Sequence, residues 1–549
     1  MQWHQYLLLS LAVGLVGRRV FVRLRLSKAK HPSLRGHSKI ARRLAKLLPF
    51  YEYGTERIFS VDGAPAEVIE RRRVAFFRLA DRSKENGPKS ILFTEALAES
   101  VSDLQFINAY RVPFQFRNYV GLHLSPGAVV TRSRGAQVED LDGKWCYDVF
   151  GSYGVNVFGY EFYKECIDEG WSRVRELGPV LGPYHPLVAE NAAKLVEISG
   201  LDEVSFHMSG TEAVMQAVRL ARYHTGRPRI VRFCGAYHGW WDGVQPGVGN
   251  ERVVNDVYTL KDMSEDTLAV LRTRRDIACV LVNPLQAMHP NSNPPADGSL
   301  ITNGFHSDFD REAYTKWLQE LRSVCDKRGI VLLFDEVFLG FRLARGGAQE
   351  YFGVRADMVT YGKTLGGGLP VGVVCGRAQL MKRFREGRPA HVCLARGTFN
   401  AHPLVMSTMN AFLRRSEEPA HALDYEALDR LWNKRLAFLN KRLETAGLTV
   451  RLANLSSIWT VLYTQPGRYH WMLQFYLRDE GLALSWIGSA RLIFPHNLSD
   501  SEFDEIASRF VRAAEAMNAD GWWWTHPGLT NKTIKRSILR ETLRLVWKQ

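Results

Sequence analysis

The sequence predicts an α/β protein in which a large domain with a mostly parallel sheet is followed by a smaller α+β domain. Two observations support this fold class. Between about residues 166 and 400, helical patterns alternate with short apolar runs such as 277–282, as expected when strands and helices alternate along a chain. The run 330–334 is apolar, contains β-branched residues and is followed by Asp335, which is typical of a buried parallel strand.

Changes of composition along the 549 residues divide the chain into six predicted segments. This length is sufficient for two to four domains. The segments are a basic, apolar N-terminal arm (1–50), a stretch of helix and loop without an assigned role (51–120), a strand–turn–strand part of the small domain (121–165), the large domain (166–400), the C-terminal small domain (401–520), and a basic, tryptophan-rich amphipathic tail (521–549).

The net charge of +15 belongs mainly to the two ends of the chain. Residues 1–46 contain eleven Lys and Arg and no acid, and residues 531–549 contain six Lys and Arg against a single Glu. No nucleic-acid-binding motif accompanies this charge, so nucleic acid is not an expected partner. The seven cysteines are scattered without CxxC or zinc-type spacing. They predict reduced thiols in a cytoplasmic protein and no metal site.

Both ends carry features of a membrane-surface anchor. Residues 6–17 are apolar but too few to span a bilayer, which takes about 20 residues, and arginines follow at once. They predict either a disordered or helical arm that packs on the protein or an interfacial anchor on an anionic membrane at its cytoplasmic face. At the other end, residues 522–524 are tryptophans, and apolar residues recur at helical spacing in 532–548. This tail is predicted to lie at a membrane interface or to dock onto the N-terminal arm.

A candidate phosphate site lies at residues 209–211. Ser209, Gly210 and Thr211 follow a predicted strand and open a helix. A helix N-terminus with hydroxyl groups, and with a Gly that allows close approach of the backbone, binds phosphate readily. The residues also fit an ordinary capping box that ends at Glu212, and taken alone the motif favours the cap.

Two further motifs carry weaker signals. Tyr237 and His238 belong to an aromatic cluster after the predicted strand 230–233. A ring at this place could stack on a flat heteroaromatic cofactor or pack in the core. Thr398 lies next to a Gly in the loop 396–400 and is uninformative on its own.

A strand-end acid and a loop lysine give the strongest chemical signal. Asp335 is predicted at the carboxyl end of a parallel strand, where open α/β sheets bind ligands. Lys363 lies further on in the Gly-rich turn 361–372. A lysine forms Schiff bases when its ammonium group is desolvated. An acid for the pyridinium nitrogen and an amine for the aldehyde are what pyridoxal 5'-phosphate (PLP) requires.

The order of these motifs resembles that of the class III (ω-type) aminotransferases of PLP fold type I. The resemblance rests on Ser-Gly-Thr-Glu-Ala at 209–213, Phe-Asp-Glu-Val at 334–337 and Gly-Lys-Thr-Leu-Gly-Gly-Gly at 362–368, and it covers roughly residues 120–515. Within the family the chain is similar to the glutamate-1-semialdehyde 2,1-aminomutase branch. The resemblance implies a large domain with a mostly parallel seven-stranded sheet, a smaller α+β domain, and PLP as the cofactor.

The resemblance implies catalytic roles for two residues. Lys363 would hold the cofactor as an internal aldimine and, once released, carry a proton between substrate and cofactor. Asp335 would pair with the pyridine nitrogen and keep it protonated. The implied reaction moves an amino group from a donor amine or amino acid to an aldehyde or ketone acceptor through pyridoxamine phosphate.

The resemblance also implies contacts with the cofactor. Tyr237 and Val337 would press on opposite faces of the ring, and His238 would be a further contact. Residues 209–211 would hold the phosphate, helped by Thr398 of a second subunit. That last role implies a homodimer with composite sites.

Two departures from the family pattern bear on the substrate. Asn283 replaces a Glu that usually follows the strand at 277–282, and Tyr153 replaces a Trp in a Gly-Ser-Trp-Gly turn near the substrate channel. The reaction could therefore be intermolecular transfer, an intramolecular 2,1-aminomutation, or another fold-type I reaction such as decarboxylation or racemisation. The alternative outside enzymes is a PLP-binding or membrane-docking protein without turnover. The apolar, basic ends favour a lipid-like or carrier-bound carbonyl substrate presented near a membrane.

Overall fold

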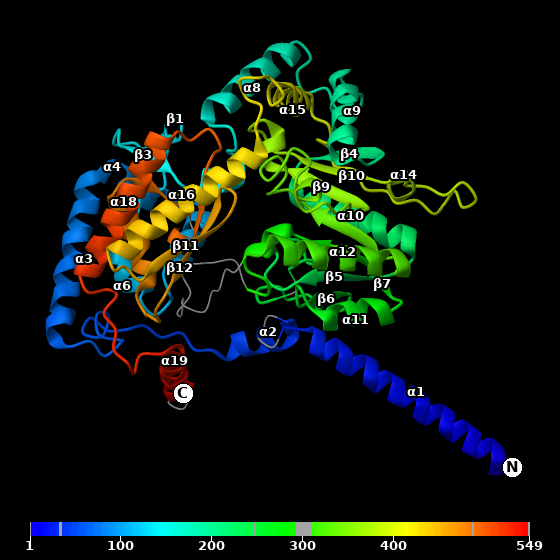
Figure 1. Cartoon of the computed structure of the whole chain (residues 1–549), viewed down its shortest axis with the longest axis horizontal. Coiled ribbons are helices and arrows are strands. Elements are labelled where there is room, and N and C mark those ends of the chain that lie inside the picture. Colours follow the sequence, from blue (N-terminus) through cyan, green and yellow to red (C-terminus); the bar gives the residue numbers. More distant parts are fainter. Residues whose placement is uncertain (1, 32–35, 246, 293–308, 486–487, 547–549) are drawn as a thin grey trace. The chain divides into compact units, whose positions relative to one another are not determined.

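The computed structural model describes residues 2–31, 36–245, 247–292, 309–485 and 488–546 (Figure 1). The chain forms two units. The first consists of Met1–Lys46, Glu169–Asn293 and Asp310–Leu413, and the second consists of Leu47–Asp168, Pro294–Phe309 and Arg414–Gln549. Two helices, α8 (Tyr160–Val174) and α15 (Pro403–Arg415), continue from one unit into the other.

The first unit is built on a seven-stranded sheet of order β4-β10-β9-β8-β7-β5-β6. Its strands pair in parallel except β10, which is antiparallel to both β4 and β9. This confirms the predicted mostly parallel sheet. The strands are β4 (Glu203–His207), β5 (Arg229–Phe233), β6 (Val257–Leu260), β7 (Ile277–Val282), β8 (Val331–Asp335), β9 (Met358–Gly362) and β10 (Gly372–Gly376).

Buried apolar strands explain why this sheet forms. All side chains of β7 and β8 are buried, as expected for central strands of a sheet covered on both faces. Helix α10 packs across strands of the sheet, and its alanines and valines share a core with residues of β5, β7 and β8. The helices of this unit include α1 (Gln2–Ala29), α2 (Ser38–Leu47), α9 (Leu187–Ser199), α10 (Gly210–Thr225), α11 (Glu265–Thr273), α12 (Arg311–Arg328), α13 (Ala348–Phe352) and α14 (Ala378–Met381).

The second unit contains two smaller sheets. One has the order β1-β2-β3-β13 and the other the order β11-β12-β14. The strands are β1 (Arg132–Arg134), β2 (Gln137–Glu139), β3 (Trp145–Asp148), β11 (Val450–Leu455), β12 (Ile458–Tyr463), β13 (Leu482–Ala483) and β14 (Arg491–Ile493). The helices include α3 (Ala66–Asn86), α4 (Pro88–Ala98), α5 (Ser102–Tyr110), α6 (Arg117–His123), α7 (Gly151–Gly154), α16 (Tyr425–Thr445), α17 (Leu473–Asp479), α18 (Asp500–Ala519) and α19 (Asn531–Val546).

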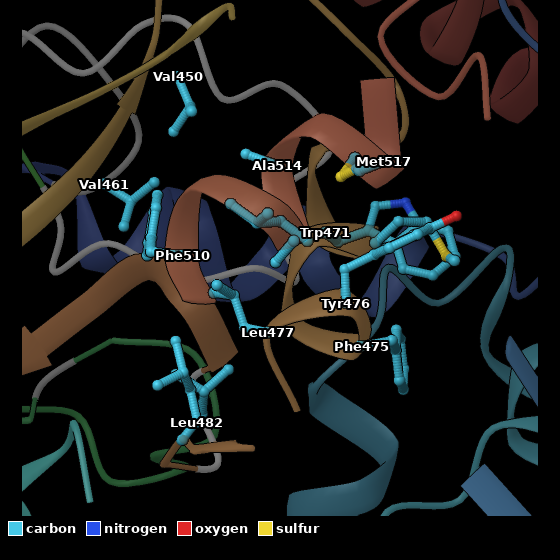
Figure 2. Packing of buried hydrophobic residues seen from close by; sticks show 14 of the residues in the cluster. Val450, Val461, Trp471, Phe475, Tyr476, Leu477, Leu482, Phe510, Ala514 and Met517 are labelled. Carbon is cyan, nitrogen blue, oxygen red and sulfur yellow. The ribbon is translucent and has the colours of Figure 1, made fainter. Parts of the chain in front are cut away.

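The core of the second unit draws on segments that are far apart in sequence. Figure 2 shows side chains of α17 and α18, among them Leu477 and Phe510, packed in one apolar cluster. Phe59, Phe76 and Phe116 belong to the same cluster. The segment 51–120, to which the sequence assigned no role, is therefore part of the core of this unit.

A buried arginine, Arg72, joins that segment to the C-terminal part of the chain. Arg72 is fully buried and donates two hydrogen bonds to Asp62, at 2.9 and 2.7 Å. The same guanidinium also donates to the carbonyl oxygens of Phe59 and Gly521, each at 2.8 Å. The guanidinium carbon of Arg72, Cζ, lies 4.5 Å from the ring centroid of Tyr469. A buried charge needs such a complete set of partners, because each unsatisfied group would retain the cost of leaving water.

Two of the three tryptophans at 522–524, Trp522 and Trp523, do not lie at a surface. Trp522 and Trp523 are 3% and 4% exposed and belong to the core of the second unit. Their indole nitrogens donate to the Tyr476 hydroxyl, at 2.7 Å, and to His470 Nδ1, at 3.0 Å. The prediction that they meet a membrane or the N-terminal arm is wrong, because an aromatic run followed by basic residues looks the same in sequence whether or not a core receives it. Helix α19 confirms the predicted helical spacing, while Trp547 and Lys548 lie outside the described residues.

The N-terminal arm is helical and in part attached to the first unit. The carbonyl oxygen of Ala29, at the end of α1, accepts a hydrogen bond from the backbone of Lys261 at 2.8 Å. Arg42 of α2 donates to the carbonyl oxygens of Asn250 and Arg252, at 2.8 and 2.9 Å. Within the described ranges, no helix combines the length and the apolarity that crossing a bilayer requires.

Replacing Arg72 tests the fastening of the segment 51–120. Arg72→Ala leaves the Asp62 carboxylate buried without its partner, and we expect the free energy of unfolding to fall by about 3–5 kcal/mol. Urea titration measures this change. Arg73→Ala is the matched control, since Arg73 pairs with Glu70 on an exposed face, and we expect a change of less than about 1 kcal/mol. Equal losses of unfolding free energy in Arg72→Ala and Arg73→Ala would contradict the role of Arg72 in holding the segment 51–120.

Candidate active site

The site begins at the carboxyl ends of two neighbouring parallel strands. Asp335 is the last residue of β8 and pairs in register with Thr360 of β9. Strand β9 ends at Gly362, and Lys363 follows at once in a short 3-10 turn, Lys363–Gly366. The topology thus brings the predicted acid and the predicted lysine to the same edge of the sheet.

The backbone of Lys363 is strained. Its φ angle is 47°, in the left-handed region that residues other than glycine rarely adopt. Such a conformation costs on the order of 1–3 kcal/mol and is found most often at ligand sites and active sites. The surrounding glycines and the end of β9 therefore hold this lysine in a position that a relaxed chain would avoid.

Three donors hold the carboxyl group of Asp335. His238 Nδ1 lies 2.9 Å from Oδ2, while the Thr360 hydroxyl and the Val337 backbone N–H donate to Oδ1 at 3.3 and 3.2 Å. Asp335 is 5% exposed and His238 is 1% exposed. Since a carboxylate only accepts hydrogen bonds, His238 carries a proton on Nδ1. The contacts fix the orientation of the acid.

His238 is a neutral donor in this contact. Burial lowers the pKa of His238, and the nearby Arg232 lowers it further, although Asp335 acts in the opposite direction. The other ring nitrogen, Nε2, is buried and has no hydrogen-bond partner within the described part of the chain. A neutral imidazole that donates a hydrogen bond from Nδ1 to the carboxylate can hold Asp335 in place.

The surroundings of Lys363 disfavour the charged form of its amine. Burial lowers the pKa of Lys363, and the positive charge of Arg342 adds to this effect, while Asp335 opposes it. Its Nζ lies 5.2 Å from the ring centroid of Phe338. The side chain is half-buried, so a ligand can still reach it. A lower pKa increases the fraction of neutral amine, which is the nucleophilic form.

Ser209 forms the helix cap that its sequence allowed. Ser209 caps helix α10, and its hydroxyl accepts the N–H of Glu212 at 3.3 Å. A Cβ atom on Gly210 would lie 2.6 Å from Val337, and one on Gly239 would lie 2.5 Å from the hydroxyl of Thr211. The two glycines therefore allow the start of α10 to pack closely against Val337 and against the Tyr237 loop. The cap is confirmed, and the binding of phosphate by residues 209–211 stays a prediction.

Tyr237 and Asn283 are linked by a hydrogen bond. The side-chain amide of Asn283 donates to the carbonyl oxygen of Tyr237 at 3.0 Å, and its oxygen accepts the N–H of Leu285 at 3.2 Å. The Tyr237 side chain is 53% exposed, and burial of its hydroxyl together with the charge of Asp335 raises its pKa. Asn283 thus positions the Tyr237 loop, and its predicted role in substrate choice stays a prediction.

Thr398 and Tyr153 are the remaining predicted residues of the site. Thr398 is exposed, on a loop of the first unit. Tyr153 belongs to the second unit and lies in the turn α7 with a φ angle of 57°. The roles predicted for both stay predictions.

Two residues of the site had not been identified in the sequence. Thr360 supports Asp335 only because of the register between β8 and β9, which no local pattern reveals. Glu336 is 1% exposed, accepts the N–H of Gln349 at 3.0 Å and that of Ala348 at 2.5 Å, and has its pKa raised by burial to about 8. Glu336 could have been noticed in the sequence as an acid next to Asp335. The sequence could not show that its side chain points away from the cofactor site.

The arrangement fits a flat anionic cofactor such as PLP. Asp335 offers an oriented acid, Lys363 an amine, and Tyr237 a partly exposed ring. The hydroxyls of Ser209 and Thr211 lie at the N-terminus of α10, and a helix N-terminus attracts phosphate. These are the groups that a pyridine nitrogen, an aldehyde and a phosphate require.

Comparisons with known proteins identify the family of this chain. The family model for class III aminotransferases matches residues 122–250 and 310–514. A glutamate-1-semialdehyde 2,1-aminomutase from Acetivibrio thermocellus is 34% identical over 306 residues, which cover 53% of this chain and 66% of that protein. One from Syntrophus aciditrophicus is 32% identical over 404 residues, or 68% of this chain and 88% of that protein.

The solved structures include a transaminase with PLP bound. It is 28% identical and superposes with a TM-score of 0.60. The superposition covers 72% of this chain and 92% of that transaminase. Because the family model matches more than half of the chain, the protein belongs to the class III aminotransferase family, whose members are PLP-dependent enzymes.

Proposed function

We propose that the protein transfers an amino group from a donor amine or amino acid to an aldehyde or ketone acceptor, with Lys363 and Asp335 as its catalytic residues. The observation that carries the proposal is their position at the ends of the adjacent strands β8 and β9. Membership of the family supports the reaction type. Sequence relatives named aminomutases favour intramolecular transfer as the second candidate.

The proposed contacts with the cofactor follow from the site. PLP, when bound, supplies an aldehyde that takes up the amino group and a ring that accepts electrons. Asp335 would face the ring nitrogen, while Tyr237 and Val337 would flank the ring and His238 would hold the acid in place. Residues 209–211 would bind the phosphate.

Lys363 is the proposed proton carrier. Its lowered pKa makes the neutral amine available, so Nζ can accept the proton from the substrate carbon that bears the amino group. The resulting ammonium can then return a proton to a different atom of the complex. Transfer in this order needs a side chain that is held at the site and also able to move, as the long stem of lysine allows.

Replacing Lys363 tests the catalytic assignment. We expect Lys363→Ala to lose the yellow absorption band of covalently held PLP and to lower kcat by about a thousandfold or more, since both attachment and proton transfer are removed. Absorption spectroscopy and steady-state kinetics with a panel of amines measure the two effects. An isotopically labelled donor then shows whether the amino group moves between molecules or within one.

Lys382→Ala is the control, because Lys382 forms a partly exposed ion pair with Glu386 at 2.7 Å, on a helix end away from Asp335. We expect its absorption and its kcat to match those of the unaltered protein. Persistence of the yellow band in Lys363→Ala would show that another lysine holds the cofactor.

We also propose a homodimer in which Thr398 completes the phosphate site of the neighbouring subunit. Its exposure supports a role outside its own chain. Each single variant, Lys363→Ala or Thr398→Val, is expected to be impaired. Mixed dimers of the two variants regain one intact site if the sites are shared, so activity of the refolded mixture should exceed the mean of the parents. Activity equal to that mean would contradict shared sites.

The N-terminal arm is our proposed contact with an anionic membrane surface at the cytoplasmic face. Helix α1 exposes apolar residues such as Leu11, Val13 and Val16, each more than half exposed, and residues 1–46 carry eleven cations and no acid. Exposed apolar side chains beside a block of cations suit the interface of anionic lipids.

Charge reversal in the arm tests this contact. Changing Arg18 and Arg19 to Glu should weaken sedimentation with anionic vesicles by about tenfold or more, since each cation near the surface contributes about 1 kcal/mol. The same reversal at the exposed Lys532 and Lys535 alters net charge equally and should have a much smaller effect. If both pairs of changes weaken sedimentation with the vesicles equally, the effect comes from net charge and not from a contact made by the arm.

A further inference from the structure

Arg232 is a buried cation of the first unit that the proposed reaction does not use. It is the residue before the last one of β5 and is 8% exposed. Within the described residues, no Asp or Glu forms an ion pair with it. Burial lowers the pKa of Arg232 to about 10, so the guanidinium still carries its positive charge at neutral pH. A buried charge without an opposite charge is costly unless other groups satisfy it.

The partners of Arg232 are two carbonyl oxygens of the Tyr237 loop, residues 234–245, which follows β5. The guanidinium donates to the carbonyl oxygen of Ala236 and to that of Val244. Ala236 directly precedes Tyr237, and Val244 lies near the other end of the loop. Because a guanidinium holds its N–H groups in a rigid planar fork, one side chain fixes the two carbonyl groups relative to each other.

Two side chains that follow β7 hold further carbonyl oxygens of this loop. Gln286 donates to the carbonyl oxygen of Cys234 at 2.8 Å, and Asn283 donates to that of Tyr237 at 3.0 Å. Both donors are neutral amides, and both act on the first half of the loop. Arg232 also reaches the second half, at Val244, and it adds a positive charge to its hydrogen bonds.

His238 is the residue of the loop on which this positive charge acts. Its Nδ1 donates to Asp335 Oδ2 at 2.9 Å, whereas its buried Nε2 has no hydrogen-bond partner among the residues that the structure describes. A second proton, on Nε2, would therefore be a buried donor without an acceptor. Burial lowers the pKa of His238 most, Asp335 raises it, and Arg232 lowers it again. Arg232 thus opposes the tendency of the acid to make the ring positive.

The charge of His238 matters for the acid beside it. A positive imidazole would stabilise the carboxylate of Asp335 and weaken its attraction for a proton. A neutral imidazole still orients the carboxylate through Nδ1, and it leaves the negative charge available to another cationic group. In the proposed site, that group would be the ring nitrogen of PLP.

We infer that Arg232 is a positioning residue of the candidate site, which fixes the Tyr237 loop at two carbonyl oxygens and keeps His238 a neutral donor to Asp335. Where it concerns catalysis, the inference rests on the proposed function, because Asp335 is a proposed catalytic residue. The two roles explain why a cation without an acid partner is buried at the end of β5.

Nitrogen NMR of the full-length holoenzyme with isotopically labelled histidine tests the inference. The signal that is missing in His238→Gln belongs to His238 and reports the charge of its ring. In the unaltered protein we expect a neutral ring from about pH 8 to about pH 5. In Arg232→Met we expect the charged ring to appear within this range, because loss of the nearby positive charge raises the pKa of His238. We also expect kcat to fall by about tenfold or more, since the loop loses its fixed position.

Two further variants separate the charge from the other properties of the side chain. Arg229→Met is the matched control, because Arg229 lies on the same strand but pairs with Asp276 at 2.7 Å. It removes the same charge and leaves the donors of the Tyr237 loop in place, so His238 should stay neutral and kcat unchanged. Arg232→Gln retains an N–H donor without the charge, and we expect its His238 to become charged as in Arg232→Met.

The outcomes distinguish this inference from the proposed function. If kcat falls in Arg232→Met while His238 stays neutral down to about pH 5, Arg232 only stabilises the fold and the inference is overturned. If circular dichroism shows that Arg232→Met does not fold, Arg232→Gln decides by the same criterion. A charged His238 in the unaltered protein at neutral pH also overturns the inference and leaves the proposed function standing. If no amine or amino acid is turned over by any form, the proposed function fails, and the charge of His238 alone decides the inference.

Discussion

The contact between His238 Nδ1 and Asp335 Oδ2, at 2.9 Å, is the interaction on which the rest of the candidate site depends. An acid at the buried end of a strand is costly unless donors surround it. His238, Thr360 and the backbone of Val337 supply those donors. They also fix the direction of the carboxyl group and join the loop after β5 to the end of β8. The acid and the loop that carries the candidate ring contact Tyr237 are thereby held in one place.

The parallel sheet turns this local contact into an active-site arrangement. Neighbouring strands that run the same way end at the same edge, so Asp335 and Lys363 meet although separate segments carry them. Lys363 then occupies a strained backbone conformation, and its lowered pKa follows from burial that Asp335 only partly offsets. The negative charge of the acid thus influences the charge of the amine.

The sequence predicted those parts of the fold and site that depend on local pattern. Apolar strands, the strand-end Asp335 and the Gly-rich turn around Lys363 are visible in short stretches, and the mostly parallel seven-stranded sheet is confirmed. Thr360 was missed because strand register is set by tertiary structure. The burial of Trp522 and Trp523 was missed for a related reason, since their partners, such as Tyr476 and His470, are distant from the tail in sequence or come from another element.

In the proposed site, Asp335 would keep the ring nitrogen of the cofactor protonated. Nitrogen NMR on protein loaded with isotopically labelled PLP measures this protonation directly. We expect a protonated ring nitrogen in the unaltered protein and in Glu336→Gln, because the buried acid of Glu336 is bonded to the backbone of Ala348 and Gln349. We expect an unprotonated ring nitrogen in Asp335→Asn. A ring nitrogen that remains protonated in Asp335→Asn would show that Asp335 does not have this role.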